Sequence, residues 1–101
     1  WRPYMPQVIL SPAALRDLKR LREFLHSKSP VVAQRAAQTI RSALTQLGQQ
    51  PAMGRTVEGL PETFREWVIS FGDSGYLARY HLEADTVVIL AIRHQREVGF
   101  I

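Results

Sequence analysis

The chain has 101 residues, 46% of them hydrophobic and 22% charged, a composition typical of one folded domain and not of a disordered segment. It contains no cysteine, which excludes a disulfide framework, a thiolate metal site and a cysteine nucleophile, and which fits a reducing compartment. The net charge is +4 and eleven of the thirteen basic residues are arginine, so we expect an acidic partner: nucleic acid, an acidic protein segment or both.

The N-terminal region is expected to contain one short strand. Residues 1–4 show no periodic pattern, and Met5 is the candidate start of the natural chain, so we expect the domain over residues 5–101 and treat residues 1–4 as candidate upstream residues. A strand is predicted over residues 5–10. No apolar run is long enough to span a bilayer, and no export signal is evident, so we expect no membrane association.

Two helices are predicted next, each opened by a serine that can cap the helix and a proline that suits its first turn. These pairs are Ser11-Pro12 and Ser29-Pro30. The first helix is expected to fade at residues 26–28, and the second to end at a cap formed by Gly48. Because few residues join them, the two helices should pack as an antiparallel hairpin. The first helix carries an apolar stripe of Leu15, Leu18, Leu21 and Leu25.

Strand patterns fill the second half of the chain. Residues 64–71 are rich in aromatic and β-branched side chains, and residues 76–82 alternate in polarity. Residues 86–92 are continuously apolar, as in a strand that is covered on both faces or central in the sheet. A loop is expected over residues 49–61, turns at residues 72–75 and 83–85, and a polar tail over residues 93–101. The order β-α-α-β-β-β predicts an α+β domain of two layers, in which the N-terminal helix hairpin packs on an antiparallel sheet of the C-terminal strands. The N-terminal strand joins that sheet at an undetermined place.

This order, together with particular residues, resembles the RelE/ParE superfamily, the toxins of bacterial type II toxin–antitoxin systems. The resemblance extends over residues 5–100 and implies the two-layer RelE/ParE-like fold, a plasmid-stabilisation-like toxin activity, and neutralisation by a ParD-like or similar antitoxin. Its motifs are Ser11-Pro12-Ala13-Ala14 with Asp17-Leu18, Pro51-Ala52-Met53-Gly54-Arg55, Gly59-Leu60-Pro61, Ser74-Gly75-Tyr76 with Tyr80, and Ile92-Arg93-His94-Gln95-Arg96-Glu97.

The superfamily divides by target. RelE-like members resemble ribonucleases that act on ribosome-bound messenger RNA, and ParE-like members resemble inhibitors of DNA gyrase. In the nuclease branch an arginine follows the Gly-Tyr of the third strand and another stands past the fourth, whereas this chain has Leu77 and Glu97 there and lacks a late hydroxyl near Phe100. Leucine and glutamate do not stabilise the charge that develops on a cleaved phosphate. We therefore expect a ParE-like inhibitor of DNA gyrase, with a ribosome-dependent endoribonuclease as the alternative.

A catalytic set is assigned only on the nuclease alternative, where it consists of Arg65, His94 and Arg96. Arginines would stabilise charge there, and an imidazole exchanges protons near neutral pH. The structural interpretation of His94, a side chain that caps the end of a buried strand, is the one we favour. The histidines lack metal-ligand spacing, so neither metal nor cofactor is expected.

The partner-binding surface is expected on the sheet. Arg79 and His81 should share one strand face, and Arg93 should lie near the end of a neighbouring strand; the alternative is scattered solvated charge. Trp67 is expected in the core. The partners implied by the resemblance are the antitoxin, in a hetero-oligomer, and DNA gyrase, in the bacterial cytoplasm; a degenerate toxin that binds its antitoxin without harming cells is a third possibility. The full candidate set for partner binding is Arg65, Arg79, His81, Arg93 and Arg96.

Overall fold

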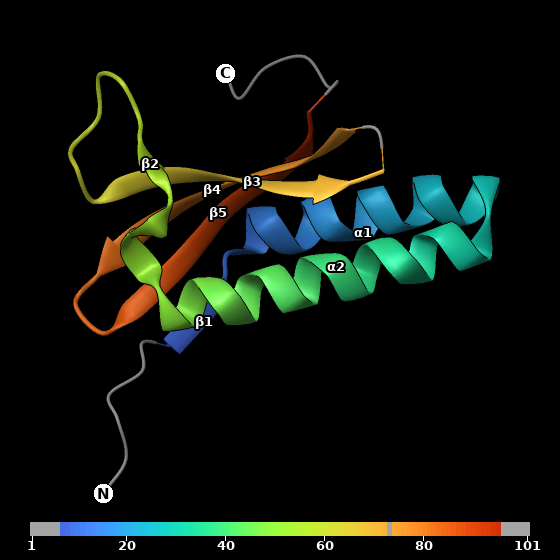
Figure 1. Ribbon diagram of the computed structural model, residues 1–101, viewed down its shortest axis with the longest axis horizontal. Coiled ribbons are helices and arrows are strands. Elements are labelled where there is room, and N and C mark those ends of the chain that lie inside the picture. Colours follow the sequence, from blue (N-terminus) through green and yellow to red (C-terminus); the bar gives the residue numbers. More distant parts are fainter. Residues whose placement is uncertain (1–6, 73, 96–101) are drawn as a thin grey trace, which may run out of the picture.

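The computed structural model describes residues 7–72 and 74–95 as two helices packed on a five-stranded mixed sheet (Figure 1). None of the helices in these ranges is long and apolar enough to cross a membrane. The elements, in chain order, are β1 (Gln7–Leu10), α1 (Pro12–Lys28), α2 (Pro30–Gln49), the short 3-10 helix η1 (Pro51–Met53), β2 (Arg55–Thr56), β3 (Phe64–Phe71), β4 (Ser74–Glu83) and β5 (Thr86–His94).

The strand order across the sheet is β1-β5-β4-β3-β2. The three long strands form the predicted antiparallel meander, with Trp67 opposite Ala78 and Ala78 opposite Ile92. The N-terminal strand β1 joins this meander at the edge formed by β5. The two strands run parallel, with Val8 opposite Val87. The predicted two-layer α+β architecture is confirmed, and β5, whose apolar sequence predicted a central strand, lies between β1 and β4.

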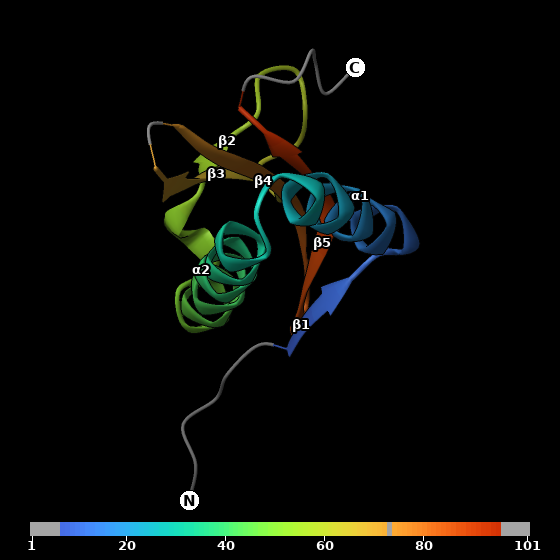
Figure 2. The same ribbon diagram turned by 90° about the vertical axis from the view of Figure 1, so that its right-hand side faces the viewer.

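Both helices begin where the serine–proline pairs predict. Ser11 accepts a hydrogen bond from the Ala14 amide at 3.0 Å, and Ser29 accepts one from the Val32 amide at 3.3 Å, so each serine satisfies an amide of the first helical turn. The helices run antiparallel, side by side (Figures 1 and 2). The predicted cap at Gly48 is wrong: Gly48 is buried inside α2, which continues through Gln49 to a cap at Gln50.

One face of the sheet and the apolar stripes of the helices form the core. α2 contacts both β1 and β3 and so crosses this face, whereas α1 packs along β5. The alternation predicted for residues 76–82 places Tyr76, Ala78 and Tyr80 inward, with at most 1% of each exposed. Trp67 packs against the same cluster, as predicted. The remaining buried hydrophobic residues of the sheet are Ile69, Val87, Ile89 and Ile92.

Further segments differ from the sequence prediction, among them Ser74, Gly75 and Glu83, which were expected in turns and belong to β4. Residues 49–61, expected as a loop, contain η1 and the two-residue strand β2, which pairs with Arg65 and Glu66 of β3. Arg93 and His94, expected to open a polar tail, extend β5 by two residues and pair with Leu77 and Tyr76 of β4. Pairing with a neighbouring strand thus holds polar residues in β5 where their own composition suggests a loop.

Candidate functional site: the open face of the sheet and its rim

The sheet turns one face away from the helices, and we call it the open face. Residues of β3, β4 and β5 alternate between the two faces, so every second side chain points away from the core. Of the predicted partner-binding residues, Arg79, His81 and Arg93 lie on this side. The open face is lined by Phe64, Glu66, Val68, Leu77, Arg79, His81, Val88, Ala91 and Arg93.

Arg79 is held by a carboxylate on the neighbouring strand. It lies opposite Glu66, whose Oε2 accepts hydrogen bonds from Nη2 at 2.6 Å and from Nε at 3.2 Å. Arg55 of β2 reaches the other carboxylate oxygen at 3.5 Å. Two arginines therefore share one glutamate, which leaves this part of the open face with one excess positive charge. The pairing also fixes the Arg79 guanidinium in one orientation.

Arg93 belongs to a second charge cluster at the rim, built around Asp17 of α1. Asp17 is only 7% exposed, and one of its oxygens accepts a hydrogen bond from the Ile92 amide at 3.0 Å. The other oxygen lies 3.6 Å from both Arg93 and Arg20. The carboxylate thereby satisfies the Ile92 amide at the edge of β5 beyond the end of β1. It also holds Arg93, at the rim of the open face, beside Arg20 of α1.

His81 stands between a carboxylate and a hydroxyl. Its Nδ1 lies 3.0 Å from Glu83 Oε1, its Nε2 lies 3.1 Å from Thr63 Oγ1, and its ring stacks on Phe64 with centroids 4.1 Å apart. A carboxylate on one ring nitrogen and a hydroxyl on the other orient an imidazole as a base. This arrangement was not predicted, because Glu83 was expected in a turn, whereas β4 continues through Glu83 and places it on the same side as His81.

Arg65 lies on the other face of the sheet. Its register partner is Tyr80, which points into the core, and its guanidinium donates to the Gly54 carbonyl at 2.9 Å and the Ala52 carbonyl at 3.3 Å. The prediction of one surface that contains both Arg65 and Arg79 is therefore wrong. Strand alternation separates the two arginines, and the Arg65 guanidinium anchors the loop that follows α2.

Tyr80 completes the same loop anchor. Its buried hydroxyl accepts from the Gly54 amide at 2.9 Å and donates to the Pro51 carbonyl at 2.7 Å. Burial raises the pKa of this phenol above 10.0, although the Gly54 hydrogen bond and the positive charge of Arg65 act in the opposite direction. A side chain at position 54 would collide with the Tyr80 hydroxyl oxygen, so the close approach requires glycine.

His94 lies at the end of β5, on the side of the core. Its Nε2 is 3.0 Å from the Ser74 hydroxyl, and its ring makes an edge contact with Tyr76. This is the position of a side chain that caps a buried strand. Arg96, the third member of the nuclease alternative and a partner-binding candidate, lies outside the described residues.

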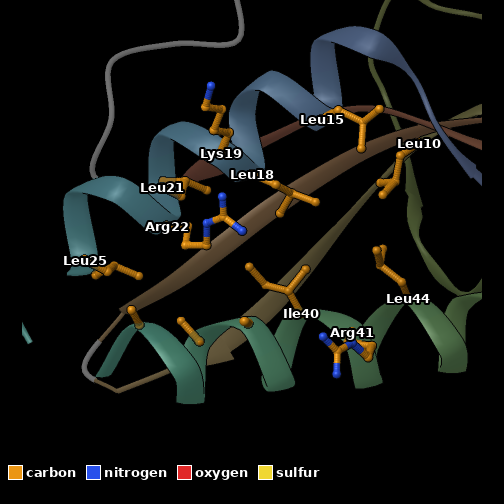
Figure 3. Close-up of a pocket in the computed structure, with 13 residues that line it drawn as sticks. Leu10, Leu15, Leu18, Lys19, Leu21, Arg22, Leu25, Ile40, Arg41 and Leu44 are labelled. Atoms are coloured by element: carbon orange, nitrogen blue, oxygen red, sulfur yellow. The ribbon is translucent and has the colours of Figure 1, made fainter. Parts of the chain in front are cut away.

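A second surface feature is a groove between the two helices, with a volume of about 420 Å³ (Figure 3). Leucines of α1 and, from α2, Ile40 and Leu44 point toward one another across it, and Leu10 of β1 lies at one end. Leu15 is 53% exposed on its wall. The basic side chains among its lining residues are Lys19, Arg22 and Arg41.

Comparison with proteins of known structure defines the class to which this architecture belongs. The chromosomal ParDE toxin–antitoxin system of Pseudomonas aeruginosa superposes with a TM-score of 0.71, at 18% identity over 91% of this chain and 98% of the other. The toxin–antitoxin complex RelBE2 of Mycobacterium tuberculosis gives 0.62, at 22% identity over 90% and 99%. At these identities the likeness shows a shared fold.

The family follows from the sequence comparisons. The model of the ParE toxin of the type II toxin–antitoxin system parDE matches residues 8–99. Toxin RelE3 of Caulobacter vibrioides is 41% identical over 92% of this chain and 98% of its own length, and Toxin RelE1 of the same organism is 37% identical over 89% and 94%. This chain therefore belongs to the ParE toxin family, within the RelE/ParE superfamily of type II toxin–antitoxin toxins, as the sequence motifs indicated.

Proposed function

We propose that this toxin inhibits DNA gyrase by binding it, without making or breaking a covalent bond, and that a cognate antitoxin neutralises it in the bacterial cytoplasm. The observation that carries the proposal is the separation of Arg65 from His94. Arg65 is opposite Tyr80 and His94 is opposite Tyr76, so they lie about 13 Å apart along the strands and about 10 Å across them. Groups that cleave one phosphodiester must converge on it, and these two do not.

The open face supplies the contact surface in this proposal. Arg79 and Arg93 project from adjacent strands, and Glu66 and Asp17 hold their guanidinium groups in place. A charged side chain that is already ordered loses less conformational entropy when a partner binds. An acidic patch on the target would complement these arginines.

The proposal is tested by a supercoiling and DNA-cleavage assay with purified gyrase and plasmid. We expect loss of supercoiling, and we expect Arg79→Ala to weaken inhibition at least tenfold. Arg16→Ala is the matched control, because Arg16 is an exposed arginine of α1. If the wild-type protein leaves gyrase unaffected at concentrations that arrest growth, gyrase is not the target.

The groove between α1 and α2 is the surface that best fits an antitoxin helix. Its floor and walls are aliphatic, and Lys19, Arg22 and Arg41 stand among them. An amphipathic helix with an apolar stripe flanked by acidic residues would bury the leucines and meet the three cations. This agrees with the two structural neighbours, which are a toxin–antitoxin system and a toxin–antitoxin complex.

A ribosome-dependent endoribonuclease is the second candidate. Relatives up to 41% identical carry the name RelE, and His81 is oriented by Glu83 and Thr63 in the manner of a general base. On this alternative the proton-transfer group is His81 and not His94. Cleavage of messenger RNA on translating ribosomes, measured by primer extension, would support it.

A further inference from the structure

The outer edge of β3 is only half covered. β2 pairs with Arg65 and Glu66, and within the described residues no strand lies beside the rest of β3 on this side. The Thr63 carbonyl accepts from Leu82 of β4, so the backbone groups of alternate residues from position 63 onward face β4. The backbone N–H and C=O groups of Val68 and Ser70 therefore point away from β4, beyond the end of β2.

A groove of about 650 Å³ runs beside this edge, between β3 and α2. Trp67 and Phe71 form its apolar side, and Gln38, Ser42 and Gln46 of α2 line the opposite side. The space therefore offers backbone hydrogen bonds along β3 and a mixed polar and apolar surface for the side chains of an added strand. This combination is typical of strand addition at a sheet edge.

The charge of the groove indicates the chemistry of its occupant. Arg35 is the one ionisable residue among the described residues that line the groove, and α2 contains no aspartate or glutamate over its length. A second copy of this chain, paired edge to edge, would bring two cationic α2 helices together without a carboxylate from either. Nucleic acid offers phosphates but no peptide groups in register with Val68 and Ser70.

We infer that the free edge of β3 at Val68 and Ser70 binds an extended, acidic polypeptide segment as an additional strand, with a carboxylate of that segment facing Arg35. The site is separate from the groove between the helices and from the arginines of the open face. The inference does not depend on which target the toxin acts on. Its occupant is a protein partner that presents alternating side chains, acidic on the side of α2.

The probe is a capped eight-residue peptide that alternates threonine and glutamate, titrated into the 15N-labelled full chain. We expect saturable binding that shifts the Val68 and Ser70 amide resonances, and at least tenfold weaker binding of a peptide that alternates threonine and lysine. Val68→Pro should weaken binding of the glutamate peptide at least tenfold. Proline suits an edge position, because the amide that it removes points away from β4.

Two variants make the experiment decisive. Val68→Thr keeps the amide and should bind as the wild type does, and Arg35→Glu should reverse the preference between the two peptides. The inference is overturned if the glutamate peptide binds wild type and Val68→Pro equally. It is also overturned if the resonance shifts are confined to the groove between the helices, or if binding does not saturate at millimolar peptide. A dimer of the wild type that Val68→Pro disrupts would also overturn it, in favour of a second copy. The gyrase assay is independent of every one of these outcomes.

Discussion

The carboxylate of Asp17, in the second turn of α1, accepts a hydrogen bond from the backbone amide of Ile92 in β5, 75 positions later in the chain, at 3.0 Å. The same carboxylate faces Arg93 and Arg20. A single buried side chain thus satisfies the sheet edge beyond β1 and determines where two arginines lie. Asp17 thus joins α1 to β5 through the Ile92 amide and also orients Arg93, which contributes positive charge to the open face.

Replacing Asp17 with alanine should destabilise the fold. The Ile92 amide would lose its partner at a buried edge, which costs about 1–3 kcal/mol of unfolding free energy. Asp17→Asn should cost less, because its amide oxygen still accepts the hydrogen bond. Urea unfolding followed by circular dichroism measures both. Equal stability of Asp17→Ala and wild type would show that this hydrogen bond contributes nothing to the net free energy of folding.

Tyr80→Phe should lower the unfolding free energy by about 1–3 kcal/mol at neutral pH, because it deprives the Gly54 amide and the Pro51 carbonyl of the tyrosine hydroxyl. Burial raises the pKa of Tyr80 above 10.0 in the folded chain, so the unfolded chain loses this proton first. The contribution of the Tyr80 hydroxyl to stability is therefore complete below the pKa of the unfolded chain. It is lost as the pH rises through the raised pKa of the folded chain. The difference between wild type and variant should shrink in urea unfolding between pH 9 and pH 11. A constant difference would rule out this linkage.

Leu15→Glu should weaken antitoxin binding at least tenfold without unfolding the toxin. Leu15 is half exposed on the wall of the groove between α1 and α2, so a carboxylate there disturbs an incoming apolar helix more than it disturbs the core. Isothermal titration calorimetry with the co-expressed antitoxin measures the change. Phe24→Glu is the matched control, because Phe24 is 60% exposed on the same helix and lies outside the groove lining. Similar losses in both variants would place the antitoxin elsewhere.

The nuclease alternative makes a distinct prediction for the two sheet histidines. If it holds, His81→Ala should abolish cleavage of ribosome-bound messenger RNA, whereas His94→Ala should leave most of the cleavage intact. The reason is that Glu83 and Thr63 orient the first ring near the open face, while the second contacts Ser74 and Tyr76. Primer extension on translated messenger RNA separates the two. Loss of cleavage in His94→Ala but not in His81→Ala would restore His94 as the proton-transfer group. If the wild type itself cleaves no messenger RNA, the nuclease alternative is excluded.

Much of the fold follows from local sequence signals. The serine–proline pairs fix both helix starts, and the alternation of residues 76–82 identifies the buried side of β4. The end of α2 was predicted wrongly. Glycine favours the position that follows a helix, but Gly48 is buried and lies within the helix. Tertiary packing overrides intrinsic propensity at that position.

The candidate site was less predictable, because it depends on register. Alternation within β4 placed Arg79 and His81 together, but only the pairing of β3 with β4 shows that Arg65 faces the other way and that Glu66 meets Arg79. Asp17 belongs to a sequence motif, but nothing local indicates that a residue in the second turn of a helix accepts a hydrogen bond from an amide of the last strand. Long-range partners of this kind cannot be found from spacing alone.

The parallel pairing of β1 with β5 has a consequence for synthesis of the toxin. Gln7–Leu10 is synthesised well before residues 86–89, with which it pairs. Asp17 and Ser11 likewise bind backbone groups of β5, so α1 cannot dock in its final position before that strand emerges. Contacts of such long sequence separation form late in folding. A nascent chain therefore remains incompletely folded until β5 has been synthesised, which leaves an interval in which antitoxin already present can meet the toxin as it folds.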